Sequence, residues 1–294
     1  MLPQVLEALG TARRVADVTL GDGGFAEALL GHGIALLGID RDAEALQRAR
    51  ARLGASACCY LHASFGSPEA LRAVTEFHPD GVVADLGVSS RLLDDPARGF
   101  SFRPGVPLDM RMDAEGPTAA EVLNRADPAQ LVRIFADYGD ERRAHRLARE
   151  VVRRRVTSPL RTSDDLVNAI RAVLGPRSGP GDFARLFQAV RIEVNGELTQ
   201  LDTALPVWRD ALTPGGCVVV ISYHSGEDRL VKHAFREWSK ACVCPTEQPM
   251  CTCRGRSYGK AVPRKPIRPT AEEIARNPRA RSARLRVFRV TDGA

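Results

Sequence analysis

A glycine-rich segment near the start of the chain has the residue types that a nucleoside cofactor site needs. Residues 15–25 read Val-Ala-Asp-Val-Thr-Leu-Gly-Asp-Gly-Gly-Phe, an apolar run followed by a glycine turn. Glycines let backbone N–H groups approach a ligand closely where a helix begins. Asp40 ends the next apolar run, where a carboxylate can accept hydrogen bonds from two ribose hydroxyls. The segment predicts half of a nucleoside-cofactor site, with NAD and S-adenosylmethionine (SAM) both open as ligands and a ligand-free turn as the alternative.

Apolar runs alternate with helical patterns around this turn, which predicts an α/β fold. Such alternation is typical of a parallel sheet with helices on both faces, whose ligands bind beyond the carboxyl ends of the strands. Gly23, Asp40, Phe65 and Asp85 all follow or end a predicted strand, so we expect them at one edge of the sheet. The predicted strands are Arg14–Thr19, Ala35–Asp40, Cys58–His62, Gly81–Asp85 and, much later, Cys217–Ser222.

The alternation stops between the fourth and fifth predicted strands. Residues 86–113 predict a long loop, and loops of this length inside a compact domain are usually functional. Its two phenylalanines and two methionines argue against a disordered linker. From Thr118 to about Leu205 the pattern is helical throughout. We therefore expect a discontinuous sheet domain at residues 1–108 and 206–294, with an all-helical domain inserted at 109–205.

Composition narrows the class of protein. The chain has 294 residues, of which 44% are hydrophobic, and no apolar run reaches the length of about 20 residues that a membrane helix needs. Its seven cysteines are an odd number and no secretion signal is visible, so we expect reduced thiols in the cytoplasm.

Positive charge is clustered in two places. Residues 140–155 contain seven arginines, and residues 254–289 contain twelve lysines and arginines against two glutamates. Together these runs predict contacts with a nucleic-acid backbone, with a merely solvated charged face as the alternative. Residues 285–290 alternate apolar and basic side chains, which predicts an edge strand with one wet face.

A cysteine-rich segment lies between these features. Cys242 and Cys244 form one Cys-x-Cys pair, and Cys251 and Cys253 form another. Four thiolates could bind zinc, but the usual spacing is Cys-x-x-Cys, so a loop with thiols and no metal is the alternative. We assign no metal ligands from the sequence.

Several segments resemble the bacterial 16S ribosomal RNA (cytosine-N4)-methyltransferase family. The resemblance covers nearly the whole chain in the family's order. Its segments are Asp17–Gly24, Gly38–Asp42, Asp85–Ser90, Leu93–Phe102, Pro107–Asp113, Phe187–Asn195, Ile221–Ser225 with Glu227 and Asp228, and Asn277–Ser282.

The resemblance implies a Rossmann-like, SAM-dependent methyltransferase domain with an inserted helical domain that recognises the substrate. It implies methylation of a cytidine N4 amine in the decoding centre of 16S rRNA, and hence the small ribosomal subunit as partner and no membrane. The oligomeric state is left open, with a homodimer as one alternative. Phe25 and Leu92 stand where the family commonly has His and Gln or His, respectively. The implied cofactor-binding positions are Gly23, Gly24, Phe25, Asp40, Phe65, Asp85 and Leu92.

The candidates for contact with a base come from their positions in these motifs. Asp85, Asp109 and His224 are candidate catalytic residues, and Phe100 and Phe102 are candidates for stacking. The alternatives are a salt bridge from Asp109 to Arg111 or Arg103, and a structural hydrogen bond for His224.

Three other functions remain to be weighed. The first is a nicotinamide-dependent oxidoreductase with the same glycine turn. The second is a non-catalytic RNA-binding or assembly factor that retains the fold. The third is methylation of another substrate, such as DNA or protein.

Overall fold

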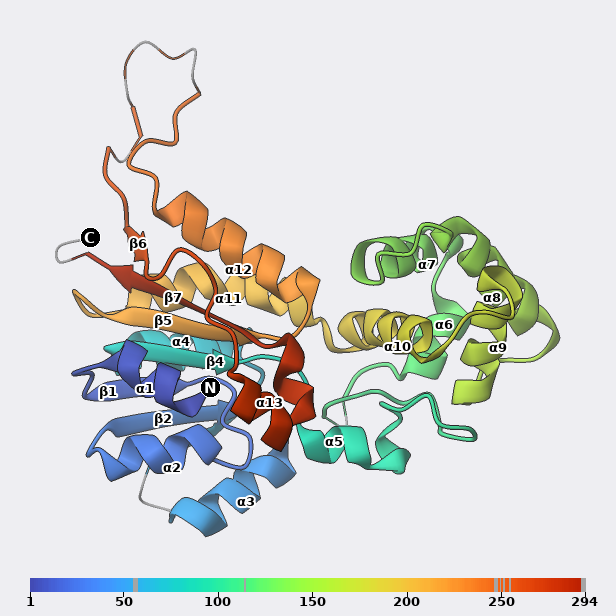
Figure 1. Cartoon of the computed structure of the whole chain (residues 1–294), viewed down its shortest axis with the longest axis horizontal. Helices are drawn as coiled ribbons and strands as arrows, with labels where there is room; N and C mark the ends of the chain where they lie inside the picture. The colour runs from blue at the N-terminus through green and yellow to red at the C-terminus, as the bar shows by residue number, and fades with distance from the viewer. Residues whose placement is uncertain are drawn as a thin grey trace. The chain divides into compact units, whose positions relative to one another are not determined.

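The computed structural model describes residues 1–54, 58–113, 115–245, 248, 250, 252–253 and 255–291. They form two compact units (Figure 1). The first comprises Met1–Gly87 and Leu198–Ala294, and the second comprises Val88–Glu197. Compared with the boundaries expected from the sequence, residues 88–108 group with the helical unit and residues 198–205 group with the sheet unit.

One mixed sheet organises the first unit. Its strand order within the described chain is β3-β2-β1-β4-β5-β7-β6, with β1 to β5 parallel and β7 antiparallel to both β5 and β6. The first five strands follow the Rossmann arrangement, in which the order reverses between β1 and β4 and creates a ligand crevice there. The predicted α/β, Rossmann-like class is confirmed. The strands are β1 Arg14–Asp17, β2 Ala35–Asp40, β3 Cys59–His62, β4 Gly81–Asp85, β5 Cys217–Ser222, β6 Gly259–Ala261 and β7 Arg284–Val290.

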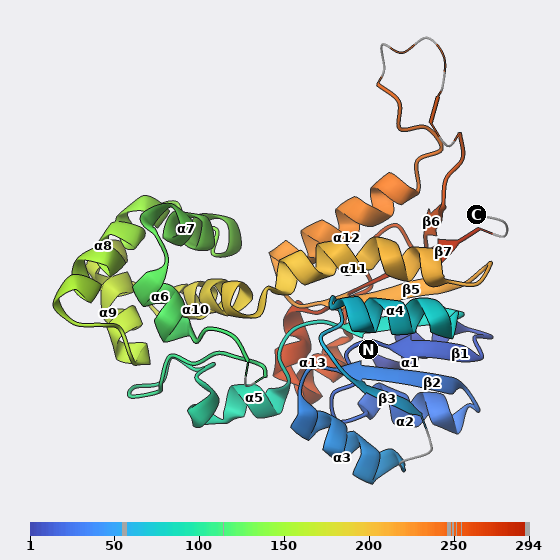
Figure 2. The ribbon, with the colours of Figure 1, turned by 180° about the vertical axis from the view of Figure 1, so that it is seen from behind.

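Helices cover both faces of this sheet, because the strands β1, β2, β4 and β5 bury side chains on both sides. Helices α1 (Leu2–Leu9), α2 (Gly24–Gly31) and α3 (Ala43–Leu53) pack on one face, and α1 and α2 lie in front of the sheet in Figure 1. The opposite face is seen in Figure 2, with α4 and α11 in front. There α4 (Pro68–Phe77), α11 (Glu197–Ala211) and α12 (Ser225–Trp238) contribute to one hydrophobic core. This core contains the fully buried Trp208 of α11. The remaining elements of the unit are α13 Ala271–Arg276 and η3 Pro278–Ser282.

The position of β7 corrects one expectation. We expected an edge strand, but β7 lies inside the sheet because β6 pairs along its outer side. Two of its basic side chains have an acidic partner, since Arg284 and Arg286 each bind the Asp228 carboxylate of α12 at 2.7 Å. Alternating charge therefore marks a paired face of this strand, which the sequence pattern alone does not distinguish from a solvated one.

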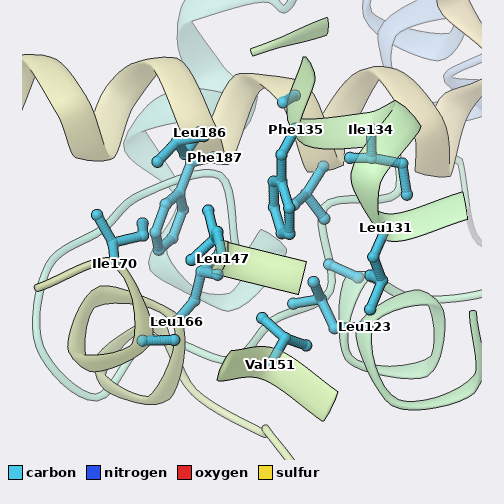
Figure 3. Close-up of a cluster of buried hydrophobic side chains, with 14 of the residues drawn as sticks. Leu123, Leu131, Ile134, Phe135, Leu147, Val151, Leu166, Ile170, Leu186 and Phe187 are labelled. Atoms are coloured by element: carbon cyan, nitrogen blue, oxygen red, sulfur yellow. The ribbon is translucent and has the colours of Figure 1, made fainter. Parts of the chain in front are cut away.

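The second unit is helical and has its own core. Buried side chains from α8, α9 and α10 interdigitate there, including Leu147, Leu166 and Leu186 (Figure 3). Among the described helices of the whole chain, none combines the length and the apolar content needed to cross a bilayer. The elements of this unit are α5 Ser90–Asp94, η1 Pro96–Arg98, α6 Ala119–Arg125, α7 Pro128–Arg133, η2 Ile134–Tyr138, α8 Ala144–Thr157, α9 Ser163–Leu174 and α10 Pro180–Asn195.

The long segment before α6 is anchored to the helical core. Leu108 and Met110 are buried in that core, at 2% and 1% exposure. The side chain of Asn195, at the end of α10, accepts a hydrogen bond from the Met112 N–H and donates one to the Met110 carbonyl. The segment expected to be a loop is thus fixed by a buried amide.

Candidate cofactor and substrate site

The glycine turn after β1 has the close backbone geometry that the sequence predicts. Gly23 adopts the left-handed conformation (φ 82°) and begins α2, and a Cβ at this position would lie 2.9 Å from the Leu53 side chain. Gly24 is exposed, with open space where a Cβ would point, and the half-buried Phe25 follows in the first helical turn. The turn therefore presents bare backbone toward the ends of the strands.

Asp40 joins the second strand to this turn. One carboxylate oxygen accepts a hydrogen bond from the Gly21 N–H at 2.7 Å, and the other accepts one from the Asp42 N–H at 2.8 Å. Each oxygen retains a second lone pair, so the carboxylate can still accept ribose hydroxyls. Burial raises the pKa of Asp40 above its usual value, although the two backbone hydrogen bonds oppose the shift.

Asp17, at the end of β1, is a site residue that sequence reasoning missed. It is 1% exposed, and Oδ1 accepts a hydrogen bond from the Thr19 N–H at 3.2 Å. Within the described residues, Oδ2 has no hydrogen-bond donor. Burial, followed by repulsion from Asp85 and Asp40, raises the pKa of Asp17 to about 7. The available signal was an acid interrupting an otherwise apolar strand.

Asp85, at the end of β4, is held by a second residue that was not anticipated, Tyr223. The Tyr223 hydroxyl donates to Asp85 Oδ1 at 2.9 Å, and the Asp85 N–H donates to Thr19 Oγ1 at 2.7 Å. Tyr223 comes two residues after Ile221, the register partner of Asp85 in the sheet, so pairing of β4 with β5 brings the two side chains together. Burial raises the pKa of Asp85 to about 6, and the Tyr223 hydrogen bond limits the rise.

These three carboxylates create a negative potential at one edge of the sheet. Asp40, Asp17 and Asp85 end the neighbouring strands β2, β1 and β4, and Asp17 interacts electrostatically with both others. Such a site favours a ligand with positive charge and disfavours the pyrophosphate of NAD. SAM carries a sulfonium and an ammonium, so the negative charge of these carboxylates fits SAM.

Phe65 supplies an aromatic surface beside the acids. Its half-buried ring packs against Trp208 of α11, with ring centroids 5.6 Å apart and planes at 59°. An aromatic side chain anchored on one side can still offer an apolar edge or face to a planar base. The predicted residues Gly23, Gly24, Phe25, Asp40, Phe65 and Asp85 all belong to the sheet unit.

Other candidates belong to the helical unit and have partners there. Leu92 lies in α5 and is 8% exposed, so it offers little surface to a ligand. Asp109 forms a two-pronged ion pair with Arg111, whose Nε and Nη2 lie 2.9 and 2.8 Å from the two carboxylate oxygens. Burial alone would raise the pKa of Asp109, but the hydrogen bonds from Arg111 lower it below the usual value. This pair is the alternative that the sequence left open.

The two candidate stacking residues also pack in the helical unit. Phe100 and Phe102 both lie against its core. The Phe102 ring contacts Phe183 and Phe187 edge-on, with centroids 6.0 and 6.1 Å away. These two ring contacts give Phe102 a clear role in packing.

His224 begins helix α12 and lines a basic pocket. Its Nδ1 accepts a hydrogen bond from the Glu227 N–H at 3.4 Å, and Nε2 lies 3.1 Å from Glu227 Oε1, so the side chain caps the helix. The pocket beside it has a volume of about 310 Å³. Its lining is polar and includes Tyr223, Ser225, Ser282, Arg268, Arg281 and Arg284.

The arginine-rich helix α8 divides its charge between the interior and the surface. Arg154 binds Glu150, and Arg155 donates to the carbonyls of Leu123 and Ala126, so these two serve the fold. Arg146 and Arg149 form an exposed row on one face of the helix, opposite the buried Leu147 and Val151. Arg153 is also exposed, but it forms a two-pronged ion pair with Glu150 at 2.8 and 2.7 Å. This exposed row is the part of the cluster available for a phosphate backbone.

Comparisons with known proteins agree with this geometry. The model of the MraW methylase family matches residues 2–291. A curated protein named "Ribosomal RNA small subunit methyltransferase H" from Gemmatimonas aurantiaca is 53% identical, covering 98% of this chain and 93% of that protein. Proteins of the same name from Rubrobacter xylanophilus and Myxococcus xanthus are 43% and 44% identical, covering 100% and 94% of this chain and 96% and 90% of those proteins.

Proposed function

The chain belongs to the MraW methylase family, and we propose that it is a SAM-dependent methyltransferase of small-subunit ribosomal RNA. Its target would be the exocyclic N4 amine of a cytidine in the decoding centre of 16S rRNA, and its place of action the cytoplasm. The observation that carries the choice of cofactor is the trio of carboxylates at the ends of β1, β2 and β4, which favours a cation.

Each part of the proposed cofactor site has a defined task. The backbone of the turn at Gly23 and Gly24 allows close approach, and Asp40 accepts the ribose hydroxyls. Phe65 contacts the adenine, and the buried charge of Asp17 supplies attraction for the cationic groups. When bound, SAM supplies an electrophilic methyl group.

Asp85 is the best-placed residue of the sheet unit to act on the amine. The lone pair of cytosine N4 is delocalised into the ring, so the amine becomes nucleophilic only when an acceptor draws one N–H out of the ring plane. Tyr223 is the only donor to the Asp85 side chain within the described residues and engages Oδ1, which leaves Oδ2 as an acceptor. Orientation and electrostatics of this kind can carry much of a rate enhancement.

Basic surfaces support an RNA substrate. Arg146 and Arg149 of α8, and Arg268 and Arg281 in the lining of the pocket beside His224, offer positive charge for phosphates. The target base would have to leave its stack to reach an acceptor at the end of β4.

The deciding experiment is methyl transfer from labelled SAM to small ribosomal subunits that lack the modification, followed by nucleoside analysis. We expect label in N4-methylcytidine at one position. Label in another nucleoside would overturn the proposed specificity. SAM binding without any transfer, on subunits or on free rRNA, would favour the non-catalytic reading.

A further inference from the structure

The segment between α12 and β6 lacks a hydrophobic core of its own. None of its described residues from Ser239 to Tyr258 is buried, and Val243 and Met250 are 46% and 75% exposed. The segment leaves the body of the sheet unit after α12 and returns to it at β6 in both views (Figures 1 and 2). Chain segments with so little core usually need a cross-link or a metal to hold one conformation.

Three sulfur atoms of this segment converge. The Sγ atoms of Cys242, Cys244 and Cys253 all lie within 4.8 Å of one another, and those of Cys242 and Cys253 are 3.8 Å apart. Zinc–sulfur bonds of about 2.3 Å in a tetrahedral site place two sulfurs about 3.8 Å apart. A disulfide requires about 2.05 Å, so the spacing matches ligands that share a metal.

The backbone around the sulfurs is arranged to support thiolates. The Val243 N–H donates to Cys253 Sγ at 3.4 Å, and Cys244 Sγ accepts hydrogen bonds from the backbone of Thr252 and Cys253. Backbone N–H groups from one end of the segment thus donate hydrogen bonds to sulfur atoms at the other end. Hydrogen bonds to the ligand atoms are the usual outer shell of a metal site.

We propose that Cys242, Cys244 and Cys253 bind a structural Zn²⁺ ion. Cys251, which completes the second Cys-x-Cys pair in the sequence, lies outside the described residues. The three converging thiolates belong to one segment and none of them is among the proposed cofactor residues, so the task of the ion is to fix the segment rather than to take part in methyl transfer.

Metal analysis of the purified full-length protein, without an affinity tag, tests the site. We expect roughly one zinc per chain, replaceable by Co²⁺ with the appearance of thiolate-to-cobalt charge-transfer absorption. Cys242→Ser and Cys253→Ser should each reduce bound zinc at least fivefold. Cys59→Ser is the matched control, because Cys59 is exposed on β3 and outside the cluster. Equal zinc in all variants, or none in the wild type, would overturn the proposal.

Two further measurements separate a metal site from its alternatives. A chelator should speed tryptic cleavage after Lys240 or Arg256 while leaving SAM affinity and the far-ultraviolet circular dichroism unchanged. Cleavage that is the same with and without chelator, or a mass showing a disulfide among these cysteines in freshly prepared protein, would overturn it.

Discussion

At the scale of single residues, Asp40 has the most clearly defined role. Replacing it with alanine removes an acceptor for two ribose hydroxyls. A hydrogen bond to a charged group contributes about 1.5–3 kcal/mol, so a loss of this size weakens SAM binding roughly ten- to hundredfold. Isothermal titration calorimetry measures this, with Glu44→Gln as control because Glu44 is an exposed acid in the first turn of α3. Unchanged affinity in a folded Asp40→Ala variant would contradict the ribose role.

Burial raises the pKa of Asp85 and the hydrogen bond from Tyr223 lowers it, which leads to a prediction about the pH dependence of the reaction. The ionised carboxylate of Asp85 is a stronger acceptor for the amine N–H than the protonated acid, so kcat/KM should rise with pH through about 6. The Tyr223 hydroxyl favours the ionised form, and Tyr223→Phe should therefore raise the pKa of Asp85 and move the acidic limb of the profile to higher pH.

The control for this pH profile is Tyr60→Phe. The Tyr60 hydroxyl bonds the Gly54 carbonyl, away from Asp85, so its loss should leave the acidic limb in place. A lower rate in Tyr223→Phe with an unshifted limb would mean that the Tyr223 hydroxyl does not control the ionisation of Asp85.

Positions at strand ends could be predicted from the sequence, whereas burial and strand register could not. The glycines, Asp40, Phe65 and Asp85 were expected because each ends or follows a strand. Asp17 and Tyr223 were missed because their importance depends on burial and on strand register, which bring Tyr223 to Asp85 from a distant part of the chain. His224 and Asp109 have partners, Glu227 and Arg111, that proximity in the sequence allowed as alternatives but did not establish.

At the scale of elements, the positions of the strands could be predicted from apolar runs in the sequence. The ends of the helices and the surfaces against which they pack could not. Four of the five predicted strands begin where expected, since apolar runs bounded by turns are a strong signal. The pattern up to about Leu205 is helical throughout, but Gly196 adopts φ 60° and separates α10 from α11. Periodicity shows that a segment is amphipathic, but it does not show which core receives the apolar face, and α11 packs on the sheet.

Asn195 offers a test of how the long segment is held to α10. Asn195→Ala leaves the Met112 N–H and the Met110 carbonyl without this partner in a buried setting, at a cost of about 1–3 kcal/mol. Amide hydrogen exchange over residues 108–113 should therefore become faster, while exchange in β1 and β4 stays unchanged. Asn195→Asp is the matched variant, because it keeps the acceptor for the Met112 N–H and loses the donor to Met110. Equal protection in all three proteins would contradict this anchoring role.

At the scale of the whole molecule, the net charge overstates how much positive charge is exposed for RNA binding. The formal charge of +6 includes Arg284, Arg286 and Arg289, which bind Asp228 or backbone carbonyls inside the sheet unit. A count of basic residues cannot separate these from exposed ones, because pairing depends on the fold. Arg146 and Arg149 on α8 are exposed, so they are the better test of the electrostatic footprint.

The double variant Arg146→Ala/Arg149→Ala should weaken binding to the small ribosomal subunit and reduce its salt dependence. Each phosphate contact that is lost lowers the slope of log affinity against log salt by about 1. SAM affinity should stay unchanged, because the cofactor residues belong to the sheet unit and the arginines to the helical unit. Arg72→Ala, an exposed arginine on α4, is the control for a general loss of positive charge. Binding measured from low to moderate salt decides the matter: if the double variant and Arg72→Ala have the same slope, α8 is a solvated face rather than an RNA contact.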